Sequence, residues 1–222
     1  MEKEKKDQLL GFFKGLGTIL LFFTFSFIAQ IILYKPLTSS NALAYNLAQI
    51  GVYLFILLGM FLLYRKQLVN DLKNFKKEYI STAIRYWFIG LCIMIISNLI
   101  ITNITGGIAA NETEVRKSLT LNPISNILIM AIIAPLIEEI TFRASFKKAF
   151  KNSLMFALVT SIFFGLAHIA KFNLMEILFI IPYGSLGFFF AKAYYDTNNI
   201  YTSYLAHFFH NLLCIFIILF LG

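Results

Sequence analysis

The chain has 222 residues, of which 59% are hydrophobic, 25 are phenylalanine and 14% are charged, and its mean hydropathy is +0.77. A composition this apolar excludes a soluble globular domain and is typical of a polytopic membrane protein. The formal net charge of +8 could suggest a nucleic-acid ligand, but the positions of the basic residues give it another explanation.

Seven apolar segments, each close to the ~20 residues that cross a bilayer core, follow one another along the chain. They are Leu9–Tyr34, Ala42–Tyr64, Ile80–Thr102, Pro123–Phe142, Ser153–Ala170, Leu174–Tyr195 and Ile200–Leu221. The first is too long for the apolar core of a signal peptide and lacks a small-residue cleavage pattern, so we expect it to be retained. The sequence predicts an all-α polytopic membrane protein of about seven transmembrane helices, forming one integral-membrane domain over residues 1–222.

The basic residues collect in alternate connections between these segments. One set of connections holds Lys3, Lys5, Lys6, Lys14, Arg65, Lys66, Lys73, Lys76, Lys77, Arg143, Lys147, Lys148 and Lys151. The opposite set holds Lys35, Arg116, Lys117 and Lys171. This asymmetry follows the positive-inside rule and predicts a cytoplasmic N-terminus and an outward C-terminus. The basic excess also attracts anionic membrane lipid, so no nucleic-acid partner is expected.

Two connections have features of their own. In Arg65–Tyr79, apolar residues recur at helical spacing among lysines, which predicts a basic amphipathic helix lying in the cytoplasmic interface. A solvated connector with incidental periodicity is the alternative. The connection Thr105–Asn122 contains adjacent glycines and mixed charges, and we expect it to be the largest exposed segment on the outer side.

The fourth segment contains two adjacent glutamates, Glu138 and Glu139, and ends at Arg143. Ionisable side chains are expensive within a membrane, so their presence there indicates a functional site. Glu139 and Arg143 are four residues apart on a helix and can form an ion pair, whereas Glu138 points about 100° away. A purely structural Glu139–Arg143 pair, with Glu138 at the cytoplasmic rim, is the alternative.

All three histidines of the chain lie in the later apolar segments. His168 ends the sequence Phe-Gly-Leu-Ala-His, and the last segment contains His207 and His210. His207 and Asn211 are four residues apart, so they present two polar groups on one helix face. A lone buried histidine is usually satisfied by a neighbour, but two histidine-containing segments beside an acidic one favour a shared site.

The ordered set Glu-Glu-x-x-x-Arg, Phe-x-x-x-His and His-x-x-x-Asn, on separate membrane segments, resembles the CPBP family. This family comprises the CAAX-prenyl endopeptidases and the bacteriocin-processing or immunity proteins, also called the Abi group. The resemblance covers about residues 123–213 and identifies this range as the part that contains the catalytic motifs. It implies an intramembrane peptidase of the glutamate or metal-dependent type, and a bacterial cell membrane is the expected location.

The resemblance also implies roles for individual residues. Glu138 and His168 match the pair that activates a water for attack on a peptide carbonyl. His207 and Asn211 match the pair that binds the oxyanion, and Glu139 with Arg143 supports the site. His210 has no counterpart in the pattern, and we expect packing or a supporting hydrogen bond.

A metal ion is the alternative to direct activation of water by Glu138 and His168. One glutamate with two histidines resembles the ligand set of hydrolytic zinc enzymes, so zinc would be held by Glu138, His168 and His207. No His-Glu-x-x-His pattern occurs, and the nearby Arg143 disfavours a dication. The sequence therefore favours a metal-free site.

Three functions compete at this point. The leading hypothesis is an endopeptidase that cleaves a membrane-associated protein tail, lipidated or not, or a peptide. The second is a non-catalytic bacteriocin-immunity or regulatory membrane protein, in which the polar cluster serves structure or binding. The third is a transporter or proton relay, which the lack of an inverted repeat in the sequence makes less attractive.

Overall fold

A computed structural model of the protein describes residues 2–221, which form helices and contain no strand. The α-helices are α1 (Glu2–Ile32), α2 (Tyr34–Leu37), α3 (Ala42–Lys73), α4 (Glu78–Thr105), α5 (Ala110–Leu121), α6 (Pro123–Leu128), α7 (Ala134–Glu139), α8 (Ser153–Ala167), α9 (Leu174–Ile177), α10 (Ile180–Thr197) and α11 (Ile200–Phe220). Between them lie two π-helical turns, η1 (Ile129–Ile133) and η2 (Ile140–Ala144), and a short 3₁₀ turn, η3 (Lys147–Ala149). The all-α prediction is confirmed.

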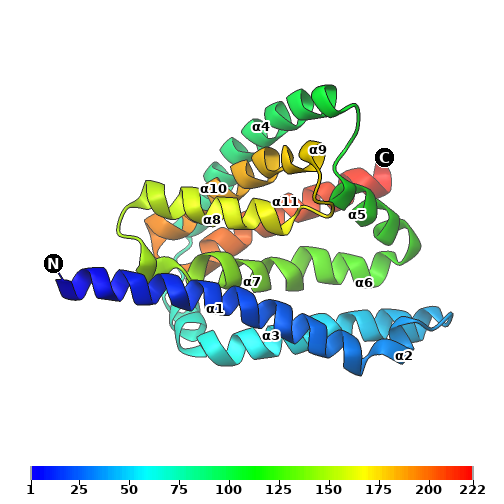
Figure 1. Cartoon of the computed structure of the whole chain (residues 1–222), viewed down its shortest axis with the longest axis horizontal. Coiled ribbons are helices and arrows are strands. Elements are labelled where there is room, and N and C mark those ends of the chain that lie inside the picture. The colour runs from blue at the N-terminus through cyan, green and yellow to red at the C-terminus, as the bar shows by residue number, and fades with distance from the viewer. Residues whose placement is uncertain (1, 222) are drawn as a thin grey trace.

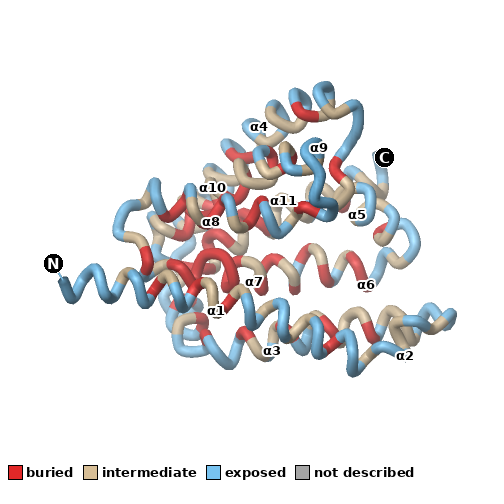
Figure 2. The backbone as a smooth tube through the Cα atoms, in the orientation of Figure 1, coloured by how far each residue is buried: buried red, intermediate tan, exposed pale blue. Residues whose placement is uncertain are grey.

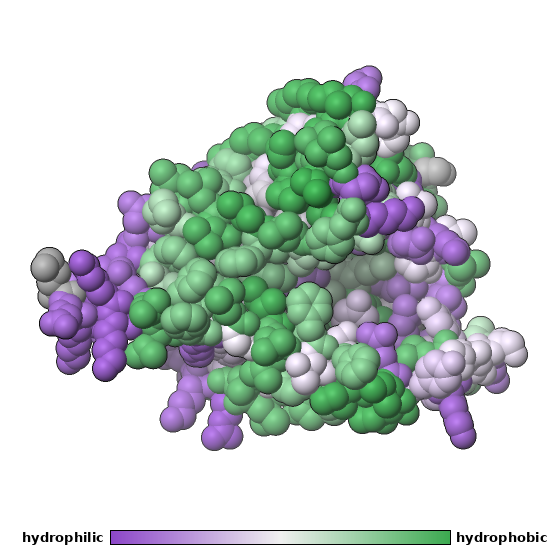
Figure 3. Space-filling model, in the orientation of Figure 1, coloured by the Kyte–Doolittle hydropathy of each residue, from purple (hydrophilic) through white to green (hydrophobic). Residues whose placement is uncertain are grey.

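Within residues 2–221, six helical stretches are long and apolar enough to cross a membrane. They are Glu2–Ile32, Ala42–Lys73, Glu78–Thr105, Pro123–Ala149, Leu174–Thr197 and Ile200–Phe220. The helices run back and forth along the long axis, so the two termini lie at opposite ends (Figure 1). The hydrophobic surface lies mainly between two hydrophilic ends, as a membrane-spanning protein requires (Figure 3).

The fifth predicted segment is shorter than expected. Helix α8 has 15 residues and ends at Ala167 instead of Ala170. At ~1.5 Å per residue it is roughly 22 Å long, less than the ~30 Å hydrocarbon core. The helix stops because His168 turns its ring back and donates from Nδ1 to the carbonyl of Phe164 in the last turn, at 2.8 Å. His168 therefore directly follows the last residue of α8.

The predicted interfacial helix over Arg65–Tyr79 is wrong as a separate element. Helix α3 continues to Lys73, and α4 begins at Glu78 after a short turn. The reason is that the inward side of this segment packs against the protein: Leu68 is buried, and the buried Asp71 carboxylate accepts the backbone N–H of Ile200 at 3.1 Å. The connection Thr105–Asn122 also differs from the expected loop, since α5 occupies most of it.

The centre of the molecule is the irregular helix that runs from α6 through η2. It contacts α1, α3, α8 and α11 around it. Burial is concentrated around α7 and η2, where η2 contacts α8 (Figure 2). In the most apolar window of Pro123–Ala149, 61% of the residues are buried, compared with 11% for α4. The helix with the two glutamates is therefore surrounded by protein, whereas α4 mainly faces outward.

Helices α8 and α10 pack closely because glycines lie at their contact. A Cβ atom added at Gly165 would lie 2.9 Å from the carbonyl oxygen of Ile180, which is too close. Small residues of this kind let membrane helices approach backbone to backbone. The predicted sixth span is interrupted between α9 and α10, and its Gly184 faces the Ser161 carbonyl across this contact. The close approach brings the end of α8 to the side of the central helix.

Candidate active site

The central helix is irregular at the site because of a proline. In η1 the N–H of Ala134 bonds the carbonyl of Ile129, five residues back. The next bond of this kind would join Pro135 to the carbonyl of Met130, but proline has no N–H. The Met130 carbonyl instead accepts the side-chain amide of Asn211 at 2.7 Å. Pro135 thereby creates the backbone acceptor that fixes α11 to the central helix, and π turns of this kind often accompany functional sites.

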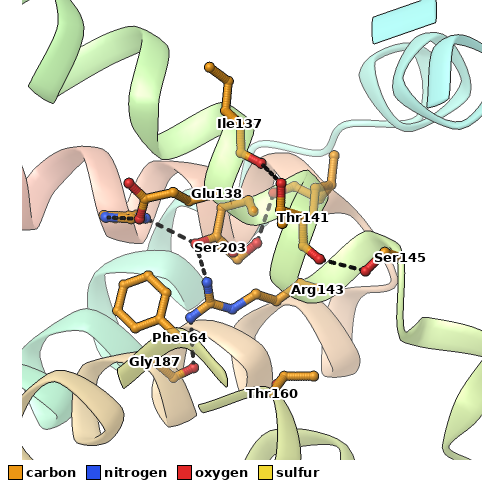
Figure 4. Close-up of polar contacts among 12 residues, drawn as sticks. Ile137, Glu138, Thr141, Arg143, Ser145, Thr160, Phe164, Gly187 and Ser203 are labelled. Carbon is orange, nitrogen blue, oxygen red and sulfur yellow. Dashed lines mark hydrogen bonds and ion pairs between the residues drawn. The ribbon is translucent and has the colours of Figure 1, made fainter. Parts of the chain in front are cut away.

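A second π turn, η2, follows the two glutamates. The N–H of Ser145 bonds the carbonyl of Ile140, again five residues back, at 3.1 Å. Hydroxyl groups serve the neighbouring carbonyls: Thr141 donates to Ile137 at 2.8 Å, and Ser145 donates to Thr141 at 2.6 Å (Figure 4). These side chains satisfy a stretch of backbone that regular α-helical bonding does not cover.

Glu139 and Arg143 form a fully buried ion pair, and both side chains are 0% exposed. Arg143 Nη1 lies 3.1 Å from Glu139 Oε1, as the spacing predicted. Arg143 Nη2 donates to the carbonyl of Gly187 at 3.2 Å, and the guanidinium lies 4.3 Å from the centre of the Phe164 ring (Figure 4). A buried pair must be well fixed to compensate for lost hydration. The ion pair, the carbonyl and the ring fix Arg143 from three directions.

His207 is held by this pair. Its Nδ1 lies 3.0 Å from Glu139 Oε1, so an ionised Glu139 places a proton on Nδ1. The ring stacks on Phe190 with centroids 4.9 Å apart and an angle of 25° between the planes. Nε2 of His207 then lies 3.9 Å from Glu138 Oε2. The orientation of His207 is therefore set by Glu139 on one side and Phe190 on its face.

His168 reaches the same carboxylate from α8. Its Nδ1 donates to the Phe164 carbonyl, which leaves Nε2 as the unprotonated nitrogen of the neutral ring. This Nε2 lies 3.8 Å from Glu138 Oε2. The ring lies 4.4 Å from the Phe164 ring and stacks on Tyr183 at 4.8 Å.

Glu138 differs from Glu139 in its exposure and in the distances to its partners. Its side chain is 23% exposed, and its Oε2 has no hydrogen-bond partner among residues 2–221. With both neutral histidines protonated at Nδ1, three acceptors converge: the Glu138 carboxylate and the Nε2 atoms of His168 and His207. Acceptors alone cannot satisfy one another, so the arrangement requires a donor between them, such as a water molecule, or a cation.

The remaining predicted residues lie at different places. Asn211 is close to the central helix and uses one amide N–H on Met130. His210 points elsewhere, with its Nε2 at 3.5 Å from the sulfur of Cys214. In the part of the chain that the structure describes, no group of three or more His, Cys, Asp or Glu side chains is arranged as a set of metal ligands.

Sequence analysis missed three residues that contact this cluster: Tyr183, Gly187 and Phe190. All three lie on α10, in a segment whose sequence reads as an ordinary apolar span with a proline and two glycines. Their spacing of four and then three residues places them on one helix face. That spacing was visible in the sequence, but nothing in it indicated which helix the face meets.

Comparison with known proteins locates the resemblance in the same part of the chain. Residues 120–213 match the family described as Rce1-like, type II CAAX prenyl endopeptidase. The resemblance drawn from the motifs is thereby confirmed, and the family indicates a protease. The match includes the central helix, α8, α10 and the part of α11 that contains His207 and Asn211.

Two relatives extend this comparison. An "Uncharacterized protein" of Mycoplasma capricolum is 33% identical over 94 residues, which are 42% of this chain and 27% of that protein. The "Putative membrane peptidase YdiL" of Bacillus subtilis is 26% identical over 88% of this chain and 79% of its own length. No solved structure matches. The apolar helices and the membrane relative together show an integral multi-pass membrane protein.

Proposed function

We propose that this chain, which matches an endopeptidase family over residues 120–213, is an intramembrane endopeptidase. Its substrate is a peptide bond in a membrane-associated protein tail or in a peptide. The observation that supports this proposal is the convergence of His168 and His207 on the unpartnered oxygen of Glu138, at 3.8 and 3.9 Å. A water placed among these atoms would be both polarised and held for attack on a carbonyl.

The reaction follows from the hydrogen-bond roles of these groups. A water donates one proton toward Glu138 and the other toward His168. As its oxygen attacks the peptide carbonyl carbon, the first proton passes to Glu138, and the C–N bond breaks when Glu138 returns that proton to the leaving nitrogen. The C–N electron pair leaves with the nitrogen, the oxyanion re-forms the carbonyl, and the second water proton stays on the new carboxyl group, so no serine or cysteine nucleophile is required.

His207 and Asn211 are proposed to stabilise the oxyanion. If His207 is protonated on both ring nitrogens, its Nε2–H could donate to the developing negative charge. Asn211 keeps one amide N–H beyond the one bound to Met130. In a site shielded from water, loss of one such donor raises the barrier by about 3–4 kcal/mol.

Zinc is the alternative, and Glu138, His168 and His207 are the residues that would hold it. Their chemistry fits, because a bound zinc ion would lower the pKa of its water and supply a hydroxide near neutral pH. Their spacing fits less well, since tetrahedral ligand atoms about 2.0 Å from zinc lie about 3.3 Å apart. The observed separations from Glu138 are 3.8 and 3.9 Å, and the Arg143 cation is close to the site. We therefore favour the metal-free reaction.

Chelation separates these two mechanisms. The purified protein in lipid vesicles should keep its cleavage rate after prolonged treatment with a strong zinc chelator, followed by its removal. Metal analysis of the same sample should find far less than one zinc per chain. A stoichiometric zinc ion whose removal abolishes cleavage and whose return restores it would establish the metal-dependent reaction instead.

The charge distribution supports a cytoplasmic N-terminus in a bacterial cell membrane. The lysines near the start of α1 and those near η3 lie at the same end of the molecule, and Glu4 pairs with Lys151 there. The opposite end contains α5 and the ends of α4 and α11 (Figure 1). With a cytoplasmic N-terminus, α5 would lie on the outer side of the membrane.

The decisive test replaces Glu138 with glutamine. Glu138→Gln preserves the shape of the side chain and removes the base, so the cleavage rate should fall by at least ~10²-fold. The matched control is Glu112→Gln, on α5, whose carboxylate pairs with Arg116. The cleavage assay would use prenylated protein tails and leader peptides as substrates. Thermal unfolding of each variant would check that it is folded. Full activity of Glu138→Gln would eliminate the proposed mechanism, and an immunity phenotype that persists without cleavage would favour the non-catalytic role.

A further inference from the structure

Both histidines of the site stack on an aromatic ring from the same helix. His168 stacks on Tyr183, with centroids 4.8 Å apart and 27° between the planes. His207 stacks on Phe190 in nearly the same way, at 4.9 Å and 25°. Tyr183 and Phe190 are seven residues apart on α10, so they lie on one face of that helix, two turns from each other.

Gly187 lies between these two rings and contacts the third charged group. Its carbonyl accepts from Arg143, and it has no side chain that could separate the two helices. A Cβ at this position would lie 2.9 Å from Phe164 and 3.2 Å from Arg143. Tyr183, Gly187 and Phe190, here called the α10 stripe, therefore contact His168, Arg143 and His207 respectively.

His168 depends on this support more than His207 does. His207 has a buried carboxylate at Nδ1, whereas His168 has a backbone carbonyl and follows the last residue of its helix. A rotation of the His168 ring by 180° would turn Nε2 away from Glu138. Contact with a stacked ring restricts that rotation, so Tyr183 can set the direction of the Nε2 lone pair.

Tyr183 is itself held from outside the central bundle. Its hydroxyl oxygen accepts the side-chain amide of Asn111 at 3.3 Å. Asn111 lies in the first turn of α5, where the N–H of Ala110 donates to the Glu176 carboxylate at 2.9 Å. The outer helix α5 is thereby connected through Asn111 and Tyr183 to the ring of His168.

We propose that Tyr183 and Phe190 are positioning residues, which hold the His168 and His207 rings toward Glu138, and that Asn111 of α5 fixes Tyr183. This inference rests on the proposed peptidase function and assigns to α10 and α5 a part in it. The segment that sequence analysis treated as an outer connection thus becomes part of the support of the active site.

The test separates the ring of Tyr183 from its hydroxyl. Tyr183→Leu removes the stacked ring, and kcat should fall about tenfold or more, with KM within about twofold, because a misdirected group loses rate rather than binding. Tyr183→Phe keeps the ring, so its kcat should fall by only about threefold. Asn111→Ala should match Tyr183→Phe, and the double variant should be no slower than either, because both changes remove the same bond.

Tyr194→Phe is the matched control. Tyr194 lies on the same helix, is buried, and has its own hydroxyl partner in Gln67 at 2.8 Å. Removing that hydroxyl perturbs α10 to a similar extent without contact to His168 or His207. The rate of this variant should stay within about twofold of the natural chain.

A spectroscopic measurement decides the inference even where cleavage fails. In protein labelled with ¹⁵N at histidine, the natural chain should show one ring tautomer for His168, protonated at Nδ1. Tyr183→Leu should broaden or split the His168 signals and leave those of His207 unchanged, and Phe190→Leu should do the reverse. An unchanged His168 spectrum together with an unchanged kcat in Tyr183→Leu would overturn the positioning role. Absence of any Glu138-dependent cleavage in the natural chain would instead reject the peptidase proposal, and the spectra would still report on the rings.

Discussion

The two sides of the helix that contains Glu138 and Glu139 differ in burial and in polar contacts. On one side, Glu139 is 0% exposed and is bonded to Arg143 and His207. On the other, Glu138 is 23% exposed, and the nearest histidine nitrogens lie 3.8 and 3.9 Å from its Oε2. Neighbouring residues on a helix point about 100° apart, and this rotation alone places one carboxylate in a closed network and the other in an open one.

The comparison shows how one helix can combine rigidity with reactivity. Glu139 cannot take part in chemistry, because its neighbours leave no room for a substrate. It can determine the orientation of His207, which reaches across to the Glu138 side. The closed side thus fixes the orientation of His207, and the open side supplies a partly exposed carboxylate. Changes on the two sides should therefore have opposite profiles: loss of stability for the first and loss of rate for the second.

The largest effect on stability is expected when one partner of the buried Glu139–Arg143 ion pair is removed. Arg143→Met removes the cation and leaves a buried carboxylate, which should destabilise the protein by about 3–5 kcal/mol. The double variant Arg143→Met with Glu139→Leu removes both charges and should recover much of that loss. Thermal or denaturant unfolding in one detergent would measure both. The double variant should nevertheless cleave slowly, because His207 has lost the carboxylate that directs it.

Equal stability of the single and double variants would show that the unpaired Glu139 carboxylate is not the cause of the loss. Glu112→Gln again serves as a control, because the Glu112–Arg116 pair is partly exposed, with side chains 31% and 40% exposed. Exposed pairs are typically worth no more than ~1 kcal/mol. The contrast between the two ion pairs tests the importance of burial directly.

The sequence predicted the closed side better than the open side. The i, i+4 spacing of Glu139 and Arg143 was sufficient to predict their ion pair, because both residues lie on one helix. The convergence of His168 and His207 on Glu138 could only be expected from the family motifs, since it depends on how three helices pack. The contact made by the Met130 carbonyl was not predictable, because its donor, Asn211, is 81 residues away on another helix.

Errors in the fold have similar physical causes. The apolar run of Ser153–Ala170 is long enough to suggest a full span, but His168 ends α8 by bonding the Phe164 carbonyl. The periodicity of Arg65–Tyr79 is real, but α3 continues through it to Lys73, and Leu68 and Asp71 are buried against the protein. In both cases the local apolar pattern is present, but contacts with other parts of the structure determine where the helix ends.

A smaller loss of stability is expected from a substitution at Gly187, where α10 contacts Arg143 of the buried ion pair. Gly187→Ala would place a methyl group 2.9 Å from Phe164 and 3.2 Å from Arg143, so one of them must move. Overpacking of this kind typically costs about 1–3 kcal/mol. Gly17→Ala is the control, since a Cβ there would meet no described atom within 4 Å, and alanine favours a helix. Unfolding should show a lower midpoint for Gly187→Ala and an equal or higher one for Gly17→Ala; equal losses would refute the close contact.

The smallest effect is expected at His210, which lies one turn from His207 on α11. Its Nδ1 has no hydrogen-bond partner in residues 2–221, and its Nε2 contacts Cys214 instead of a carboxylate. His210→Phe replaces a poorly satisfied polar ring with an apolar one, so stability should be unchanged or slightly higher. The cleavage rate should stay within about twofold, whereas His207→Phe should lose at least ~10²-fold because a proton donor at the site is removed. Parallel rate measurements on the two variants compare histidines in the same helix, with nearly the same depth in the membrane. A similar loss in both would mean that depth, and not the carboxylates contacted by His207, makes a histidine part of this site.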